Sequence, residues 1–339
     1  MGMASPAGAP VRSSPPRRAR AAPSRARVLA RFGPALALLG LGLLIAAVNP
    51  RFATLDNLRS IAGQSAIPLV LAVGLTFVIL AGAIDLSIEG IMAISSVVVS
   101  FLVANPRTPF DLGLLGVVVA VAIGGLLGLA NGLIHVGLRI PSFMVTLGMW
   151  SIGVGAATVL YGGFPTPVRD PMVRSWALEQ TAGFSNLTLF ALGTLAVGYA
   201  IQRYTRVGRY AYAIGGNEDL ARLSGVAVGR YKVMIFTFAG LCFGLGGVLT
   251  AARIGQGTAN VGSGTLFATV TAVVVGGTAL TGGTGGVLQS LVGVLFVTTL
   301  NNGMILVGIH PFVQQAVQGL LIIVAVALTM DRARVWIVK

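Results

Sequence analysis

The side chains in this sequence that could carry out chemistry are few and widely spaced. There is one cysteine, Cys242, and the two histidines, His135 and His310, lie far apart in the sequence, so no cluster has the spacing of a metal site. The glycine-rich stretch at 276–286 lacks the Gly-Lys-Ser/Thr of a phosphate-binding loop. The sequence therefore predicts no metal site, no cofactor, no ATPase site of its own and no catalytic set for a membrane enzyme.

Asp85 lies between two apolar segments, in a short break at residues 81–90. An ionisable residue at membrane depth usually takes part in function. Alternatively, Asp85 or Ser87 caps a helix that opens at Ile88, with Glu89 in its first turn. The two interpretations are compatible, because broken helices line transport paths.

Several amide side chains lie in or beside apolar stretches, where an unpaired amide costs free energy. They should therefore face protein or a transport path, and neutral amides suit a neutral polyol better than an ion. Hydrogen bonds between helices are at least as good an interpretation for each of them. Together with Asp85 and Ser87, the candidates for a translocation path are Gln64, Asn131, Asn301 and Asn302.

Residues 203–231 form the most polar stretch after the N-terminal segment, and they contain the signals of a short helix with two defined ends. Gly215-Gly216 is expected to break the chain, and Asn217 to cap a helix with two carboxylates in its first turn. Gly225 supplies a C-terminal stop. These signals and six nearby cations favour a docking helix over a plain linker. The segment comprises Gly215, Gly216, Asn217, Glu218, Asp219, Leu220, Ala221, Arg222, Leu223, Ser224 and Gly225.

The composition shows what surrounds these residues. Of 339 residues, 55% are hydrophobic and only 9% are charged, against roughly 25% charged in a soluble domain. The mean hydropathy is +0.89, and the 47 glycines lie largely among apolar residues, as in close-packed membrane helices. We therefore expect an all-α polytopic membrane protein. The net charge of +14 comes from arginines that flank apolar segments, which indicates topology rather than binding to nucleic acid.

Ten apolar segments approach the roughly 20 residues that cross a bilayer, so about ten transmembrane helices are expected, with broken helices near 81–90 and 282–286. The segments lie near 32–48, 58–80, 88–104, 112–134, 141–161, 184–202, 232–252, 266–281, 286–306 and 312–330. Glycines four residues apart, at Gly124, Gly128 and Gly132 and at Gly240 and Gly244, predict close helix packing inside the subunit in preference to a dimer seam.

The basic residues indicate the orientation. If the chain starts in the cytoplasm and the ten segments alternate, 17 of the 23 basic residues fall inside and six outside, as the positive-inside rule requires. Both termini are therefore expected in the cytoplasm. The expected organisation is a disordered basic tail at 1–31 (a transit peptide is the alternative), one transmembrane domain at 32–330 with the cytoplasmic loop 203–231, and a basic tail at 331–339.

Three stretches resemble a known family. GRYAYAIGGNEDLARLSGVAV, around the predicted docking helix, is similar to the cytoplasmic coupling segment of permease subunits of bacterial ABC importers. AIDLSIEGIMAISS at 83–96 resembles the signature Gly-Gly-Ile-Asp-Leu-Ser-Val-Gly of the ribose-type sugar permeases, which are related to branched-chain amino acid permeases. Residues 272–308 resemble the C-terminal glycine-rich block of that family.

The sequence departs from the family pattern at three places. Ala83 replaces the second signature glycine, Ile88-Glu89 stands where the signature has Val-Gly, and Thr265-Leu266 stands where many members have Glu-Leu. The resemblance covers about residues 49 to 330, and its three stretches occur in the order expected for the family.

The resemblance implies a permease subunit of an ATP-driven importer for a sugar or sugar-like solute, in the bacterial cytoplasmic membrane. Its implied partners are separate ABC ATPase subunits, a second permease subunit (a copy or a paralogue), and a periplasmic or lipid-anchored binding protein. The segment from Gly215 to Gly225 would then couple to the ATPase. Branched-chain amino acids and nucleosides remain alternative solutes, and a secondary transporter that uses Asp85 and Glu89 remains an alternative class.

Overall fold

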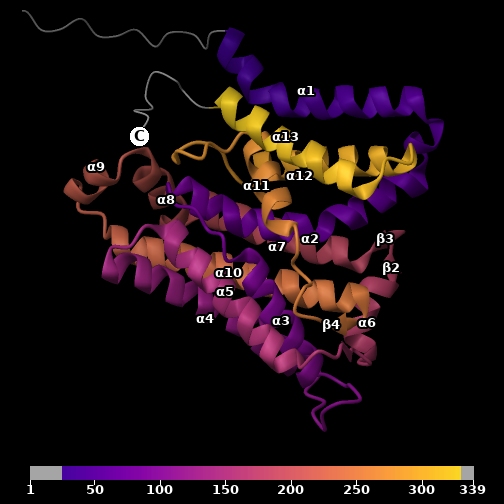
Figure 1. Cartoon of the computed structure of the whole chain (residues 1–339). Coiled ribbons are helices and arrows are strands. Elements are labelled where there is room, and N and C mark those ends of the chain that lie inside the picture. Colours follow the sequence, from indigo (N-terminus) through magenta and orange to yellow (C-terminus); the bar gives the residue numbers. More distant parts are fainter. Residues whose placement is uncertain (1–24, 330–339) are drawn as a thin grey trace, which may run out of the picture.

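The computed structural model describes residues 25–329, which are predominantly helical (Figure 1). The first helices are α1 Arg25–Val48, the 3-10 helix η1 Pro50–Ala53, α2 Leu55–Leu80, α3 Ile88–Leu102, α4 Leu114–Leu138, α5 Ser142–Tyr161 and α6 Pro171–Leu178. The remaining helices are α7 Asn186–Tyr204, α8 Arg206–Gly216, α9 Glu218–Leu223, α10 Val228–Ile254, α11 Thr265–Val275, α12 Val287–Leu306 and α13 Pro311–Thr329. The four strands are β1 Thr166–Pro167, β2 Gln180–Thr181, β3 Phe184–Ser185 and β4 Gln256–Gly257.

Each of the ten predicted apolar segments contains a helix, but α11 ends at Val275, so the second break, predicted near 282–286, already begins at residue 276. Among the described residues, five helices are long and apolar enough to cross a bilayer: α2, α4, α5, α10 and α12. α1, α3, α11 and α13 contribute shorter apolar stretches, and α7 has 19 residues. The prediction of an all-α polytopic membrane protein is therefore confirmed. α1 begins at Arg25, seven residues before the predicted segment, and the greater part of both predicted tails lies outside the described residues.

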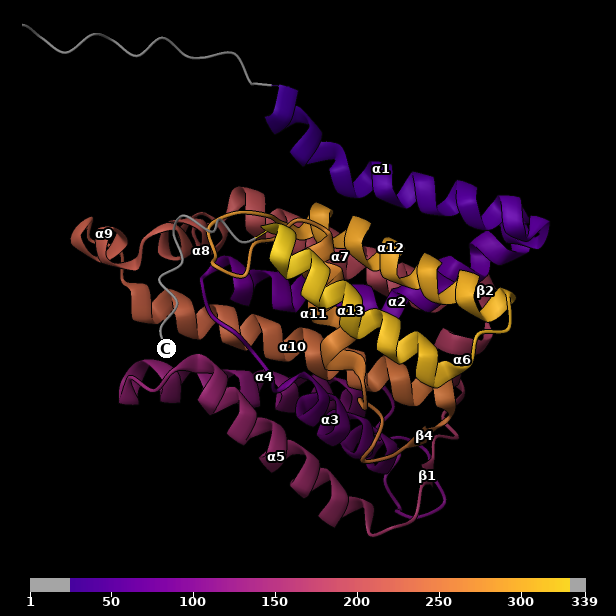
Figure 2. The same cartoon turned by 45° about the horizontal axis from the view of Figure 1, so that its top comes forward.

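The connections between the helices gather at two ends of the bundle (Figures 1 and 2). One end, the α9 end, holds α8, α9, the turn from α4 to α5 and the breaks at 81–87 and 276–286. The opposite α6 end holds η1, α6 and both strand pairs. Two contacts fix this arrangement: Thr166 of β1 pairs with Gly257 of β4, and the Gly283 amide donates to the Leu80 carbonyl over 3.0 Å. The predicted alternation of the segments is consistent with these two ends.

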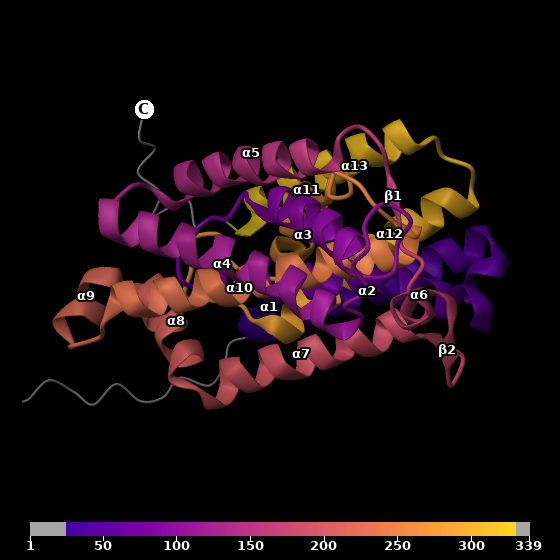
Figure 3. The same cartoon turned by 90° about the horizontal axis from the view of Figure 1, so that it is seen from below.

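The core is built around α2, which packs against α7, α10, α11 and α12. Figure 3 shows α5 and α7 on opposite sides of this core. α4 and α10 approach closely through their glycines: a Cβ on Gly124 would lie 2.6 Å from the Gly240 carbonyl oxygen and 2.7 Å from the Gly244 Cα. The prediction that these glycines pack inside the subunit is confirmed, because no larger residue fits between the two backbones.

The two long connections contain structure that the sequence patterns did not indicate. Residues 162–183 include α6 and β2, and residues 203–231 include α8 as well as the predicted short helix α9. α8 ends at Gly216 and α9 begins at Glu218, so the chain breaks directly after Gly215-Gly216, although both glycines belong to the last turn of α8. Gly215 also makes a close contact between backbones.

Candidate functional site

The predicted docking helix α9 has the end signals expected from the sequence. The Asn217 side chain accepts a hydrogen bond from the Leu220 amide over 2.9 Å, which caps the helix. Gly225 has φ +82, and the Val226 amide bonds back to the Ala221 carbonyl over 3.1 Å, as in a Schellman stop. The geometry of both predicted ends is therefore confirmed, while the role of α9 in coupling remains a prediction.

Glu218 fastens α9 to the start of α10. Its carboxylate lies 2.8 Å from the Arg222 guanidinium and 2.6 Å from the Lys232 ammonium. Partial burial raises the pKa of Glu218, but the hydrogen bond from Lys232 and the charges of Lys232, Arg222 and His135 outweigh it, so the pKa lies below its usual value. The opposite face of α9 exposes Leu220 and Leu223, so it is free to contact another protein.

A junction of backbones, which we call the glycine junction, connects α8 to both broken segments. It consists of Gly82 after α2, Gly215 in the last turn of α8, and Gly282 and Gly283 in the loop before α12. A Cβ on Gly215 would overlap the Leu80 carbonyl oxygen, and one on Gly282 would lie 2.8 Å from the Gly82 Cα. No side chain separates these backbones, so α8 lies in direct contact with residues 81–87 and 276–286.

Asp85 is the centre of a buried polar network. Its Oδ1 accepts hydrogen bonds from the Ser87 amide over 2.8 Å and from the Ser87 hydroxyl over 2.6 Å. The Ser87 hydroxyl in turn accepts from the Asn131 amide over 2.9 Å. All three residues are at most 1% exposed. Asp85 Oδ2 and Asn131 Oδ1 accept no hydrogen bond from the described part of the chain, so the network has capacity for an additional donor.

The break that carries Asp85 runs inside the bundle along α5. The Ile84 amide donates to the Ser142 hydroxyl and the Leu86 amide to the Thr146 hydroxyl, each over 3.0 Å. Asn131 lies seven residues before the end of α4, about 10 Å along the helix axis. The Asp85 network therefore lies within the span of the helices. α3 begins at Ile88, but the expected side-chain cap is not formed: Ser87, its N-cap residue, makes no capping hydrogen bond, and within residues 25–329 Asp85 bonds only to Ser87. A role of Asp85 in a transport path stays a prediction.

The N-termini of the two shortest apolar helices, α3 and α11, lie close together. Oε1 of Glu89, in the first turn of α3, accepts a hydrogen bond from the Leu266 amide in the first turn of α11 over 3.2 Å. The residue before α11 is Gly264, which has no side chain to cap it, so Glu89 supplies the carboxylate that favours this helix end. The sequence analysis did not select Glu89 as a path residue.

The contact of Glu89 relates two departures from the family pattern to each other. Glu89 stands where the family signature has glycine, and Thr265 stands where many members have glutamate. The structure places these positions side by side: a Cβ on Gly262 would lie 2.8 Å from the Glu89 Cα, and Thr265 bonds to the Gly262 carbonyl over 2.6 Å. In the sequence, this contact was indicated by two departures from the family pattern that occur together: position 89 gains a carboxylate, and position 265 lacks the one that many members have.

Two adjoining cavities lead from the α6 end towards this contact. The outer one, of about 430 Å³, is lined mostly by polar and charged side chains, including Asp56, Arg59, Ser60, Gln64, Gln180 and Arg253. The deeper one, of about 270 Å³, shares Gln64 and Arg253 with the first and reaches Met92 and Thr265. Sequence reasoning selected Gln64, but it missed Arg59 and Arg253, which it used only to assign topology.

The remaining predicted path residues hold helices together. Asn302 and Asn57 exchange two hydrogen bonds of 3.0 Å, which join α12 to α2. Asn301 accepts from Gln318 over 3.0 Å, which joins α12 to α13. The structure thus brings Asp85, Ser87 and Asn131 together and places Gln64 in the cavities, but it gives Asn301 and Asn302 partners on neighbouring helices.

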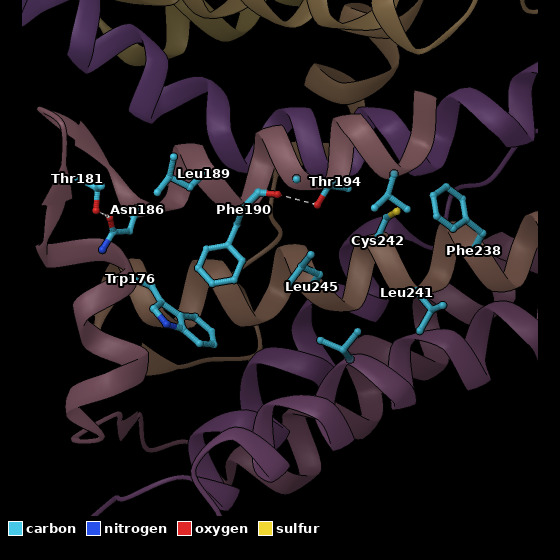
Figure 4. A pocket seen from close by; sticks show the side chains of 13 residues that line it. Trp176, Thr181, Asn186, Leu189, Phe190, Thr194, Phe238, Leu241, Cys242 and Leu245 are labelled. Carbon is cyan, nitrogen blue, oxygen red and sulfur yellow. Dashed lines mark hydrogen bonds between the residues drawn. The ribbon is translucent and has the colours of Figure 1, made fainter. Parts of the chain in front are cut away.

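An apolar groove of about 740 Å³ lies between α7 and α10 (Figure 4). Phe190, Trp176 and Leu245 line it, and its polar side chains Thr181 and Asn186 bond to each other over 2.7 Å. Such a lining offers a polar molecule few hydrogen bonds. Within residues 25–329, no group of three or more His, Cys, Asp or Glu side chains is placed to hold a metal ion.

A bundle of many apolar helices, two of which begin at a polar contact inside the bundle, defines a polytopic membrane protein. The chain belongs to the family described as the permease component of the branched-chain amino acid transport system, whose model matches residues 57–326. The family resemblance inferred from the sequence is thereby confirmed.

Several characterised or named proteins are similar to the chain over most of its length. The probable ABC transporter permease protein YphD of Escherichia coli (strain K12) is 35% identical over 292 residues, covering 86% of this chain and 87% of that protein. The ribose import permease protein RbsC of Bacillus subtilis (strain 168) is 34% identical over 308 residues, covering 90% and 94%. The galactose/methyl galactoside import permease protein MglC of Escherichia coli (strain K12) is 34% identical over 306 residues, covering 86% and 91%. No solved structure matches the chain significantly.

Proposed function

We propose that this chain is the membrane-spanning permease subunit of an ATP-driven importer for a sugar or sugar-like solute. ATP is hydrolysed by separate ABC ATPase subunits, a binding protein delivers the solute at the α6 end, and a second permease subunit completes the translocation unit. The names of the similar proteins, which are ribose and galactose permeases, support the solute class. The observation that carries the mechanism is the glycine junction, which joins the α8–α9 segment to the break that holds Asp85.

In this proposal the α9 end faces the cytoplasm, and α9 docks on an ATPase subunit. The excess of basic residues in the segments assigned to this end supports the orientation, which places both termini in the cytoplasm. The exposed Leu220 and Leu223 form the docking face. When the ATPase moves α9, α8 moves with it, and the glycine junction transmits the displacement to residues 81–87 and 276–286.

The proposed solute path follows polar side chains from one end of the bundle to the other. It enters at Gln64 and Arg253 in the outer cavities, continues past Thr265 to Glu89, and reaches the Asp85 network. The two unpaired acceptors of that network suit solute hydroxyl groups, which can donate hydrogen bonds to them. Tight binding is not required here, because the binding protein provides the selectivity.

The alternatives are weaker on specific grounds. Branched-chain amino acids appear in the description of the family model, but the similar proteins with a named solute are sugar permeases, and no similar protein described above names a nucleoside. A secondary transporter needs carboxylates that can bind and release an ion. Glu89 is already engaged by the N-terminus of α11, which leaves Asp85 alone for that role.

The glycine junction supplies the test. Gly215→Ala adds a methyl group that overlaps Leu80, whereas Gly216→Ala, one residue on, adds it to open space. Both variants are reconstituted in proteoliposomes with the partner ATPase subunits and binding protein, and uptake of labelled ribose and galactose is measured with ATP hydrolysis. The amount of folded protein is measured as well, and we expect Gly215→Ala to lose coupled uptake per folded molecule and Gly216→Ala to behave as the unaltered protein.

Three outcomes would contradict the proposal. Normal coupled uptake by Gly215→Ala would remove the mechanical role of the junction. Uptake or ATP hydrolysis by the purified chain without ATPase subunits would refute the division of labour. Uptake of leucine but of neither sugar would show that the solute is an amino acid and not a sugar.

A further inference from the structure

A polar cavity of about 670 Å³ opens at the α9 end, between α4, the α4–α5 turn, the start of α10 and one face of α9. Its titratable lining side chains are His135, Arg139, Glu218, Arg222 and Lys232. Besides His135, three cations face one carboxylate, so these four side chains carry two positive charges in excess. Neither the docking of α9 nor the solute path described above accounts for this excess.

Arg139 is the cation with an open guanidinium. Glu218 already lies between Arg222 and Lys232, while Arg139 forms no ion pair or side-chain hydrogen bond with the residues that the structure describes. Its backbone has φ +57, a region where arginine is uncommon and asparagine or glycine is preferred. An arginine held in this conformation at the end of α4, with its charged group free, is consistent with recognition of an anion.

The faces of α9 distinguish two possible sources of that anion. Glu218 and Arg222, one turn apart, face the cavity, whereas Leu220 and Leu223 on the other side are 61% and 85% exposed. An ATPase subunit that docks on the apolar side would leave the cavity uncovered. The cavity is bounded chiefly by the ends of membrane helices, where lipid headgroups lie. Exposed Leu138 beside it offers apolar surface to an acyl chain.

We propose that this cavity binds the phosphodiester headgroup of an anionic phospholipid. Arg139 contacts the phosphate. The N–H groups of Arg222 and Lys232 that do not bond to Glu218 add to the positive electrostatic potential around it. The bound lipid joins the α4–α5 turn to α9 and steadies the docking helix against the bundle. The inference rests on the proposed function only for assigning this end of the bundle to the cytoplasmic leaflet. Anionic lipids give that leaflet a negative surface potential.

The test measures lipid binding directly and requires neither transport nor ATPase. The full chain is placed in nanodiscs that contain equal parts of phosphatidylglycerol and phosphatidylcholine, released, and analysed by native mass spectrometry for retained lipid. Arg139→Asn removes the charge with a residue that tolerates positive φ, and Arg139→Lys keeps the charge. Arg51→Asn, which removes an exposed arginine at the opposite end, is the matched control.

We expect selective retention of phosphatidylglycerol by the unaltered chain and by Arg51→Asn. Arg139→Asn should lower the apparent affinity for that lipid about fivefold, the contribution of one cation near an anionic surface, and Arg139→Lys should retain most of it. Equal retention of both lipids by the unaltered chain, or unchanged selectivity in Arg139→Asn, would overturn the proposal. Displacement of the lipid by millimolar inorganic phosphate would also overturn it, because the cavity would then be a site for free phosphate.

Discussion

The two broken segments of the bundle lie against the same helix, α8, but they are held by different means. Residues 81–87 are fixed by side chains, with Asp85, Ser87 and Asn131 in one network and two α5 hydroxyls on the backbone amides. Residues 276–286 are fixed chiefly by backbone conformation, with five glycines at positive φ, and by hydrogen bonds that the Tyr212 and Thr278 hydroxyls make with the backbone of Gly285 and Gly286.

Because of this difference, substitutions in the first segment should affect mainly transport, and substitutions in the second should affect mainly folding. In residues 81–87 a polar group can be changed while the packing stays intact, so the expected loss is in transport. In residues 276–286 a methyl group added at Gly276, Gly282, Gly283 or Gly285 meets backbone, so the expected loss there is in stability and assembly. The predictions below test that separation in order of decreasing expected effect.

The largest effect is expected for Gly285→Ala. Gly285 has φ +113, and a Cβ there would overlap the Cα and hydroxyl of Thr278. The strained backbone costs about 1–3 kcal/mol, and the overlap adds about 1–3 kcal/mol, so the amount of folded protein and its melting temperature should fall sharply. Gly277→Ala is the control, because it has φ +104 but its nearest contact is Pro34 at 3.9 Å. Equal losses in the two variants would mean that the overlap at Thr278 is relieved by relaxation.

Asp85→Asn is expected to impair uptake more than abundance. The amide oxygen can still accept from Ser87, so the loss of stability should stay below about 1.5 kcal/mol, while the charge inside the span disappears. Uptake per reconstituted molecule and protein level in the membrane are measured together. Ser87→Ala, which breaks the link to Asn131 without removing the charge, is the comparison. If Asp85→Asn is only less abundant and transports normally per molecule, Asp85 is a structural cap alone.

Variants in α9 provide a third case, because the conformation of this helix is set by its own capping residues rather than by packing against other helices. Gly225→Val places a β-branched residue at φ +82, which costs about 1–2 kcal/mol locally, and Glu218→Arg puts a cation at the positive helix end, worth about 0.3–1 kcal/mol. Both variants should reach the membrane in normal amount and fail to stimulate the partner ATPase. Co-purification with the ATPase and solute-stimulated hydrolysis are the measurements, and normal values for both would make this loop a linker.

The same helix should respond to acid. Because the pKa of Glu218 is below its usual value, its ion pairs stabilise the attachment of α9 above the unfolded pKa of about 4.3. That contribution is lost as the pH falls through the lowered pKa. Hydrogen exchange in residues 217–225 should therefore accelerate, relative to its intrinsic rate, only below about pH 4, and Glu218→Gln should remove this step. A transition near neutral pH would assign it to another group.

The smallest effect is expected at the contact between α3 and α11. Glu89→Gly removes the carboxylate from the α11 N-terminus, at a cost of about 0.3–1 kcal/mol. Thr265→Glu alone sets a second carboxylate near the first and should also destabilise. The double variant moves the charge from one helix to the other and should recover the melting temperature and the uptake of the original chain. If the two single effects simply add, the two positions are independent.

Much of the candidate site could be predicted where it depends on near neighbours. The cap at Asn217 and the stop at Gly225 were readable because each is completed within a few residues of sequence. The break at Asp85 was readable because a charged residue interrupts two apolar runs. α8 was missed because its polar, arginine-rich stretch resembles a loop, and its Thr205 cap, which bonds to the Gly208 amide over 3.4 Å, is a weak signal by itself.

The sequence alone determined the number of apolar segments, their helical character and the two ends of α9, because these follow from composition and from interactions within one or two helical turns. Only the tertiary structure decided that Gly215 meets Leu80, that Glu89 serves α11, and which amides join helices. Such contacts link residues far apart in the sequence. In a membrane, helices associate through close packing and individual hydrogen bonds rather than through hydrophobic burial, so no single segment reveals its partner.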